Sequence, residues 1–421
     1  MHSKPEQQIR VNMPQKKHAP LSREELKVVA ILTLLLFIGL MGTDIHLSSL
    51  PEMTKFMGTT QKLMQSSISI FLLGVGCSAL VYGPLSDKYG RKPVIMIGIS
   101  TAIAGNLWAT TLSDIEPFLA SRFVQGFGSG VSIALSRVVL SDIVQGERYA
   151  ITSSYITMFT GLSIVFGPVI GSAIQSWYGW QTNFVVMAAM LFCILVIYAL
   201  LCPETNRYKD QSIKLHECFA NYRSVLKNDI LLLATVLSGI GMACFVMYTS
   251  SSAFILQELF GMSPTDYGWM SAFVGAGLLV SRSLLPKLIN NYGMHTVIAT
   301  GLIILIVSGF SLLLLTESGY LSTTTFLISV SGVFFSYTFI VICASAISMT
   351  PFTDKRGAAG AVYSCSQMAL AFMVNALVSV MSDNSVLIIS TCYMTLPIIG
   401  LYLCRKIQTK QLHSASGVKA Q

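Results

Sequence analysis

Long apolar runs dominate this chain of 421 residues, and each run is about as long as a membrane crossing. A helix needs roughly 20 residues to cross about 30 Å of hydrocarbon. Hydrophobic residues make up 53% of the sequence and charged residues only 11%, which is too few charges for an ordinary soluble domain. We therefore predict an all-α polytopic membrane protein with twelve transmembrane helices, near residues 28–49, 66–85, 94–112, 116–141, 150–174, 182–202, 230–257, 266–287, 295–316, 321–349, 357–381 and 385–404.

The basic residues indicate how these helices are oriented. With the N-terminus placed inside, 22 of the 27 Lys and Arg residues fall on the inner side, and only Lys55 and Lys62 fall outside. The positive-inside rule then places both termini in the cytoplasm. The same asymmetry explains the net charge of +8, so no nucleic-acid partner is expected. No signal peptide is expected either, because about 27 mostly polar residues precede the first apolar run.

The chain divides into two similar halves. We predict a cytoplasmic linker at 203–229 between six-helix halves at 28–202 and 230–404, with cytoplasmic tails at 1–27 and 405–421. The halves match weakly at a shift of 203 residues, where Gly58 falls on Gly261 and Gly90 falls on Gly293. Because the shift also superposes the helix pattern, we expect an internal duplication that encloses a central path, an architecture suited to alternating access.

No catalytic, metal or cofactor site is expected. The nine cysteines are scattered and lie mostly within helices, and no C-x-x-C spacing occurs, which favours small buried side chains over metal ligands or disulfides. The sequence also lacks H-E-x-x-H, G-x-S-x-G and glycine-rich phosphate-binding motifs. We therefore expect that the chain is not an enzyme and has no resident cofactor.

The densest group of charges lies between the second and third predicted helices, at residues 83–92, with the sequence G-P-L-S-D-K-Y-G-R-K. A charged turn this short needs glycine for tight backbone geometry, and Gly83 and Gly90 supply it. The stretch resembles the loop signature G-x-L-[SA]-D-[RK]-x-G-R-[RK] of the major facilitator superfamily at every specified position. That resemblance implies twelve helices in two halves and a transport function.

Three further stretches resemble signatures of the same superfamily in the same order. Residues 122–126 resemble the R-x-x-Q-G of helix four, and residues 203–205 resemble the P-E-T that closes helix six. Gly161 with residues 167–171 resembles the G-P-x-x-G helix-five signature of proton-driven antiporters.

A narrower resemblance points to the Bcr/CmlA branch of the drug:proton antiporters. Residues 44–51, D-I-H-L-S-S-L-P, are similar to its D-M-Y-L-P-A-L-P, and Arg137 with Asp142 is similar to its R-x-x-x-x-D at the end of helix four. His46 and Ser48 depart from the branch pattern, which affects the expected substrate range more than the fold.

Asp44 is the only acidic side chain well inside a predicted segment. An ionised carboxylate at a helix centre costs about 2.5 to 3.5 kcal/mol, so an intramembrane acid is a functional candidate. Arg122 is predicted at the same depth, and Gln125, one turn further on, can hydrogen-bond either group. We expect a proton switch in which Asp44 and Arg122 pair and separate during transport. Interfacial solvation of Asp44 and a permanent structural ion pair are the alternatives.

His46 is a weaker candidate for proton coupling. It is the one histidine of six within a predicted core helix, and imidazole titrates near physiological pH. A spacing of two residues from Asp44 is wrong for one face of a helix. The alternative is a histidine at a loop edge that faces lipid head groups.

The charged turn is interpreted as a cytoplasmic gate. The resemblance implies contacts from Asp87 and Arg91 to Asp142, at the inner end of helix four, and to the segment after Gly357. Such a cluster would hold the halves together inside while the outside is open. Positive-inside topology alone would explain the lysines of the turn but not an aspartate. The predicted gate residues are Gly83, Asp87, Gly90, Arg91 and Asp142.

Helix five and an aromatic group complete the candidate site. The glycines and proline of helix five are expected to bend it and admit a neighbouring backbone closely, with ordinary helix packing as the alternative. These residues are Gly161, Gly167, Pro168 and Gly171. Aromatic side chains are expected to line an apolar substrate cavity, and the weaker candidates are Phe245, Tyr248, Trp269 and Tyr337.

Together these features predict a proton-coupled secondary transporter that exports small, largely apolar compounds, including drugs, from a bacterial inner membrane. The expected partners are a small-molecule substrate, protons and membrane lipid, and the chain is expected to function as a monomer. One alternative on the same fold is an exporter or symporter of an endogenous metabolite such as a siderophore or amino acid. A receptor that binds a ligand without transporting it is an alternative of another class, although the tails and linker are short for an output domain.

Overall fold

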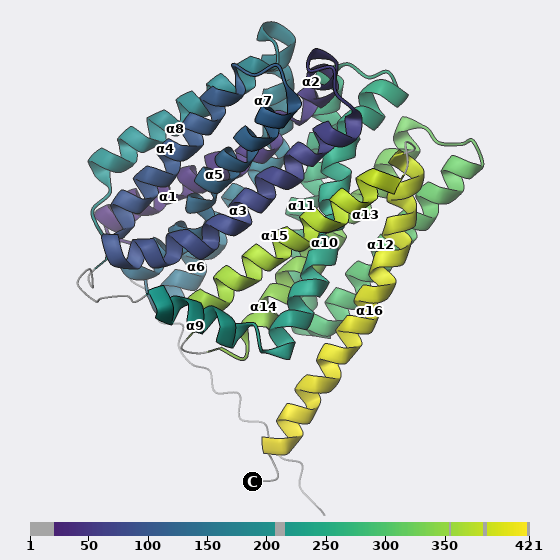
Figure 1. Ribbon diagram of the computed structural model, residues 1–421. Helices are drawn as coiled ribbons and strands as arrows, with labels where there is room; N and C mark the ends of the chain where they lie inside the picture. Colours follow the sequence, from purple (N-terminus) through teal and green to yellow (C-terminus); the bar gives the residue numbers. More distant parts are fainter. Residues whose placement is uncertain (1–20, 207–214, 353–354, 382–384, 419–421) are drawn as a thin grey trace, which may run out of the picture.

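The computed structural model describes residues 21–206, 215–352, 355–381 and 385–418, and this part of the chain is built from helices without a strand (Figure 1). The N-terminal half contains α1 (Arg23–Asp44), a 3₁₀ turn (Leu47–Ser49), α2 (Leu50–Phe56), α3 (Gln61–Tyr89), α4 (Arg91–Ala109), α5 (Ile115–Ile143), α6 (Gly146–Thr160), α7 (Leu162–Tyr178) and α8 (Gln181–Leu201). After α9 (Leu215–Val225), the C-terminal half contains α10 (Asp229–Phe254), a π-helical turn (Ile255–Leu259), α11 (Pro264–Tyr292), α12 (Met294–Glu317), α13 (Thr323–Tyr337), a second π-helical turn (Thr338–Ile342), α14 (Cys343–Met349), α15 (Arg356–Met381) and α16 (Ser385–Val418).

The membrane-crossing helices follow the order expected from the apolar runs. Eleven helical spans in the described ranges are long and apolar enough to cross a membrane. The 19-residue α4 falls outside this group, because Arg91 and Lys92 open it, yet it packs against α5 and α8 in the same bundle. With α4, the twelve predicted segments are all present as helices.

The first crossing is interrupted near its outer end. It begins with a capping box, in which the Ser22 amide donates to Glu25 Oε2 at 2.7 Å and the Glu25 amide donates to Ser22 Oγ at 3.2 Å. Regular helix ends at Asp44, and a 3₁₀ turn precedes α2. Pro51 has no amide hydrogen for the carbonyl of Leu47, so one continuous helix would lose a hydrogen bond here.

The two halves repeat the same local geometry at the 203-residue shift. Helices α3 and α11 are both 29 residues long, and their starts and ends differ by that shift. Gly90 ends α3 with φ 102° and Gly293 ends α11 with φ 78°, while Gly58 and Gly261 before these helices also have positive φ. Glycine tolerates this left-handed backbone, which explains why it stands at matching positions.

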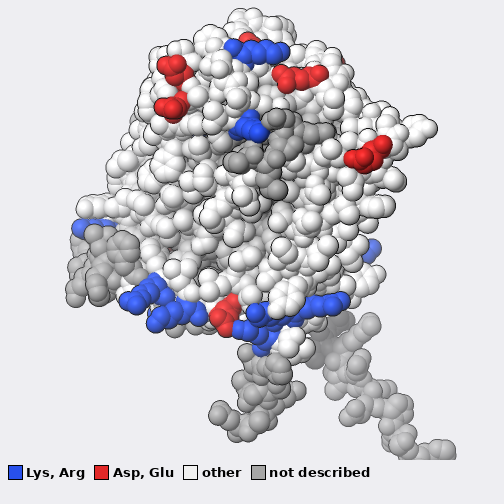
Figure 2. Space-filling model, turned by 45° about the vertical axis from the view of Figure 1, so that its right-hand side comes forward, with Lys and Arg blue, Asp and Glu red and all other residues white. Residues whose placement is uncertain are grey.

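Charged side chains separate along the direction of the helices. Figure 2 shows Lys and Arg gathered along the lower edge of the molecule, with Asp and Glu mainly near the opposite end. The basic end holds the junction of α3 with α4 and the C-terminal end of α5. This end is therefore the cytoplasmic one by the positive-inside rule.

The halves meet along two helix pairs, α3 with α15 and α7 with α11. Small residues permit the close approach in the second pair. A Cβ on Gly268 of α11 would lie 2.9 Å from the carbonyl oxygen of Pro168 in α7 and 2.2 Å from Ser172 Oγ. Helix packing in membranes uses such small residues because lipid supplies no hydrophobic drive for helix association.

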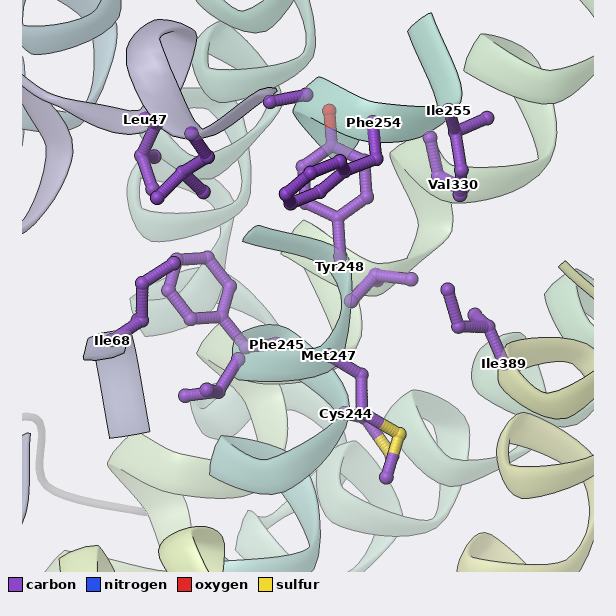
Figure 3. Packing of buried hydrophobic residues seen from close by; sticks show 14 of the residues in the cluster. Leu47, Ile68, Cys244, Phe245, Met247, Tyr248, Phe254, Ile255, Val330 and Ile389 are labelled. Atoms are coloured by element: carbon purple, nitrogen blue, oxygen red, sulfur yellow. The ribbon is translucent and has the colours of Figure 1, made fainter. Parts of the chain in front are cut away.

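At the outer end, polar and apolar contacts cross between the halves. Gln257 Nε2 donates to the Ser48 carbonyl at 2.7 Å, and Gln65 Nε2 donates to Ser251 Oγ at 3.2 Å. One hydrophobic cluster spans both halves. In Figure 3, Leu47 and Ile68 of the N-terminal half lie beside Phe245 and Phe254 of α10, among other members of the cluster. The outer ends of the two halves are therefore in contact.

At the cytoplasmic end, the linker helix α9 packs on both halves. Its Val225 is fully buried against Val362 of α15, in a small cluster that includes Leu80 of α3. Tyr222 Oη donates to the Leu80 carbonyl at 3.0 Å. Burial raises the pKa of Tyr222 to about 12, so the phenol keeps the proton that it donates.

Candidate proton-coupling and transport site

Asp44 is the last residue of α1 and lies just before the break in the first crossing. Only 6% of its surface is exposed. The Asp44 carboxylate takes part in none of the hydrogen bonds or ion pairs found among the described residues. Interfacial solvation, the alternative considered from the sequence, therefore does not describe its environment in this structure.

The glycines of α7 bring this end of α1 close. A Cβ on Gly167 would lie 2.9 Å from Asp44 Cβ, and a Cβ on Gly171 would lie 1.7 Å from the carbonyl oxygen of Ile45. The neighbouring backbone that helix five was expected to admit is therefore the end of α1. The first glycine of the motif, Gly161, instead joins α6 to α7 and leaves room for Arg282 of α11, whose Nη1 would lie 2.8 Å from an added Cβ.

Arg122 is fully buried in the middle of the N-terminal half. Its Nη1 donates to Gln125 Oε1 at 2.5 Å, and Gln125 Nε2 donates to the Gly105 carbonyl at 3.1 Å. The guanidinium also lies 4.5 Å from the ring centroid of Phe71 and 5.9 Å from that of Phe184. Its Nε and Nη2 have no hydrogen-bond partner among the described residues. Gln125 therefore binds the Arg122 guanidinium as predicted, and the Nε and Nη2 donors of Arg122 remain unpaired among the described residues.

Asp44 and Arg122 do not form the predicted ion pair in this structure: no ion pair between described residues joins them. Asp44 lies instead within electrostatic range of Tyr267 and Tyr337 in the C-terminal half. A permanent structural ion pair is therefore not what this structure contains. The expected switch, in which the pair forms in another state of the cycle, is a prediction that one structure does not test.

His46 is fully buried, so the alternative of a histidine facing lipid head groups is wrong. Its ring centroid lies 5.6 Å from that of Phe184, the same ring that the Arg122 guanidinium approaches at 5.9 Å. Neither ring nitrogen of His46 has a hydrogen-bond partner among the described residues. Helical spacing does not govern its direction, because α1 has already ended and His46 opens the 3₁₀ turn.

The aromatic candidates separate into two groups. Phe245 stacks on Tyr337 with a centroid distance of 4.5 Å, and both Phe245 and Tyr248 contact Phe334. These residues form part of the packed core toward the outer end, and the Tyr248 hydroxyl has no hydrogen-bond partner in the described chain. Trp269 of α11, by contrast, is 62% exposed and is not part of this core.

Residues 32–400 match the family model of the Major Facilitator Superfamily. The chain belongs to this superfamily. Multidrug resistance protein MdtL of Shewanella oneidensis is 25% identical over 355 residues, which cover 83% of this chain and 88% of that protein. Multidrug resistance protein D of Escherichia coli is 23% identical over 346 residues, which cover 81% and 85%. A crystal structure of the D-xylose-proton symporter superposes with a TM-score of 0.69 at 14% identity, over 89% of this chain and 96% of that one. That likeness supports the fold alone.

The superfamily signature at residues 83–92 forms a corner of two helices and not the ten-residue turn expected from its sequence. Helix α3 runs to Tyr89 and α4 starts at Arg91, so only Gly90 lies between them. Gly90 has the positive φ that the corner requires. Gly83 is an ordinary helical residue within α3 and does not have positive φ. The charged residues that follow it do not end the helix, which continues to Tyr89.

Arg91 is the centre of the charge network at this corner. Its guanidinium contacts Asp87 and donates to Asp142 Oδ2 at 3.3 Å. Glu204 caps the start of α4, with Oε1 2.9 Å from the Arg91 amide and Oε2 3.2 Å from the Lys92 amide. Thr205 Oγ1 donates to Asp142 Oδ2 at 3.2 Å. The P-E-T segment thus fastens the network to the end of α8.

The predicted contact from this network to the segment after Gly357, which is the start of α15, is absent among the hydrogen bonds and ion pairs of the described residues. A cavity of about 550 Å³ lies between the two instead, with Asp87 and Arg91 on one wall and Arg356 to Met368 on another. The outer ends are in contact while this cavity lies at the cytoplasmic end. The network therefore joins α3, α4 and α5 of one half in this conformation.

Glu204 and Gln257 are the residues of this site that sequence reasoning did not single out. The P-E-T resemblance was a signal for Glu204, since an acid placed after one helix can cap another. Gln257 carried no signal, because its bond to the Ser48 carbonyl joins residues more than 200 positions apart.

Asp87→Asn is expected to slow transport while leaving substrate binding nearly unchanged. The amide still accepts a hydrogen bond from Arg91 but loses the charge, and one charge-assisted bond is worth about 1.5 kcal/mol, or roughly a tenfold change in rate. Initial transport rates in proteoliposomes and equilibrium binding in detergent separate the two effects. Asp114→Asn is the matched control, because Asp114 is exposed and makes no side-chain cap. Loss of substrate binding together with wild-type transport rates would contradict the assignment of this network as a gate.

Proposed function

We propose that this superfamily member exports small, largely apolar compounds in exchange for protons by alternating access. The observation that carries the proposal is Asp44, a buried carboxyl group without a cation beside it, held against the glycines of α7. Relatives that cover most of the chain carry the name multidrug resistance protein, which supports drug export over the uptake of a nutrient.

In the proposed cycle, Asp44 takes a proton from the outside when the outer ends of the halves are apart. A carboxyl group buried without a counter-ion is far cheaper as the neutral acid, so the halves rock inward with the proton bound. The proton leaves toward the cytoplasm, and Asp44 then pairs with the two free donors of Arg122 as substrate binds. The contact of the outer ends and the cytoplasmic cavity support assigning the structure to the inward state before the proton leaves.

The energy source is sufficient for uphill export. One elementary charge crossing 100 mV is worth about 2.3 kcal/mol before any pH gradient is added. We further propose that the chain works as a monomer surrounded by lipid in a bacterial cytoplasmic membrane. The multi-pass architecture and the bacterial relatives support this location.

Inside-out proteoliposomes test the proposal, because their outer face then presents the cytoplasmic cavity. We expect dyes and antibiotics from a panel to accumulate in the lumen when the lumen is acid, and to leak back when a protonophore removes the gradient. Amino acids and sugars, tested in parallel, are expected to stay at the level of protein-free liposomes. Gradient-independent accumulation, or accumulation of the metabolites alone, would refute drug:proton antiport.

A further inference from the structure

The cytoplasmic cavity is lined by arginines from both halves of the protein. Arg137 comes from α5 of the N-terminal half, and Arg356 comes from the start of α15 in the C-terminal half. The other charged lining residues are Asp87 and Arg91, which are bound to each other. The remaining charge on the walls is therefore positive.

Arg137 is a cation on the cavity wall without a counter-ion among the described residues. It lies six residues before the end of α5, about 9 Å along the helix at 1.5 Å per residue, and its side chain is exposed to the cavity. Among the described residues it has neither a hydrogen bond nor an ion pair. The nearest acid along the helix, Asp142, is engaged by Arg91 and Thr205.

A third arginine adds to the same field from the C-terminal half. Arg282 of α11 lies within electrostatic range of Arg137. Its Nη1 donates to the Thr157 carbonyl of α6 at 3.1 Å, through the space that Gly161 leaves open, and its Nε has no partner in the described chain. A hydrogen bond to a carbonyl orients the guanidinium but does not neutralise it.

Cations without counter-ions are expensive at membrane depth and mark a ligand path. The guanidinium fork matches the oxygens of a carboxylate, phosphate or sulfonate. The rest of the cavity wall is largely apolar and includes Val75, Ile133 and Met368. The site thus combines an anion-binding group with an apolar surface.

We propose that the cytoplasmic cavity binds amphipathic anions, with Arg137 receiving the anionic group and the apolar wall receiving the body of the molecule. This inference rests on the proposed export function and narrows its substrate class to compounds that carry a carboxylate, phosphate or sulfonate. The head group of an anionic phospholipid carries the same chemistry.

Two dyes of nearly the same shape test the charge requirement. Anilinonaphthalene sulfonate carries one sulfonate, and N-phenylnaphthylamine is its neutral counterpart. Each is titrated by fluorescence into nanodiscs of phosphatidylcholine that contain the protein, with empty nanodiscs subtracted. We expect Arg137→Gln to weaken sulfonate binding about tenfold, the scale of one charge-assisted hydrogen bond, and to leave binding of the neutral dye unchanged. Arg137→Lys is expected to restore part of the loss.

Arg148→Gln is the matched control, since Arg148 lies on the same cytoplasmic side outside the cavity and pairs with Glu25 at 2.8 Å. Equal loss for both dyes, or no loss for either, would overturn the proposal. Adding phosphatidylglycerol distinguishes the source: competition with the sulfonate dye identifies the lipid head group as a ligand of the same site, and no competition assigns the site to soluble anions. Arg137-dependent binding without gradient-driven export of the dye would refute the export function and leave the anion site standing.

Discussion

Asp44→Asn is expected to reduce proton-driven accumulation of substrate to the level of liposomes without protein. Asparagine keeps the size of the side chain in its buried position against Gly167 but can neither take up nor release a proton. Exchange of substrate for substrate, which needs no net proton movement, is expected to continue. The measurement compares accumulation under an imposed pH gradient with counterflow at equal pH, in the same inside-out proteoliposomes.

Glu52→Gln is the control for this substitution. Glu52 lies near the outer end of the same crossing, and its Oε2 accepts a hydrogen bond from Gln175 at 2.7 Å, which an amide oxygen can also accept. Its variant is expected to transport normally. Wild-type rates of gradient-driven accumulation by Asp44→Asn would rule out Asp44 as the proton carrier.

Gly171→Ala is expected to destabilise the protein and to abolish transport. Its Cβ would lie 1.7 Å from the Ile45 carbonyl oxygen, so the end of α1 must move away from α7. Overpacking typically costs about 1 to 3 kcal/mol, and this contact is with backbone, which cannot rotate away. Retention of the monomer peak after heating in detergent measures the stability, and the proteoliposome assay measures the displacement of Asp44.

Gly277→Ala in α11 separates this effect from the general response to alanine in a helix. Its Cβ would meet only two ring carbons of Phe335, at 3.5 and 3.9 Å, which are ordinary contacts. Alanine is favoured over glycine within a helix by about 0.5 to 1 kcal/mol, so this control is expected to be neutral or slightly stabilising. A stable and active Gly171→Ala protein would mean that α1 and α7 need not touch at Asp44.

The candidate site was predictable where local chemistry restricts it. Asp44 stood out because an acid in an apolar run is costly, and the α7 glycines stood out because a close backbone contact requires them. The position of His46 was not predictable, since it depends on where α1 ends, which Pro51 and the packing of the 3₁₀ turn decide together. The sequence predicts a ten-residue turn at 83–92, whereas the structure has a corner of one residue, because charged residues near a helix end do not stop a helix.

The sequence by itself determined the class of the protein, its orientation and its twofold repeat. Hydrocarbon excludes unpaired backbone groups and charges, so apolar runs and the inner excess of Lys and Arg leave little freedom in topology. Only the tertiary structure decided that Asp44 and Arg122 are apart, that Arg91 bonds within one half, and that Arg137 faces a cavity. Each of these depends on which helices are in contact in one conformation, and an alternating transporter changes those contacts at small cost in free energy, so no local pattern encodes them.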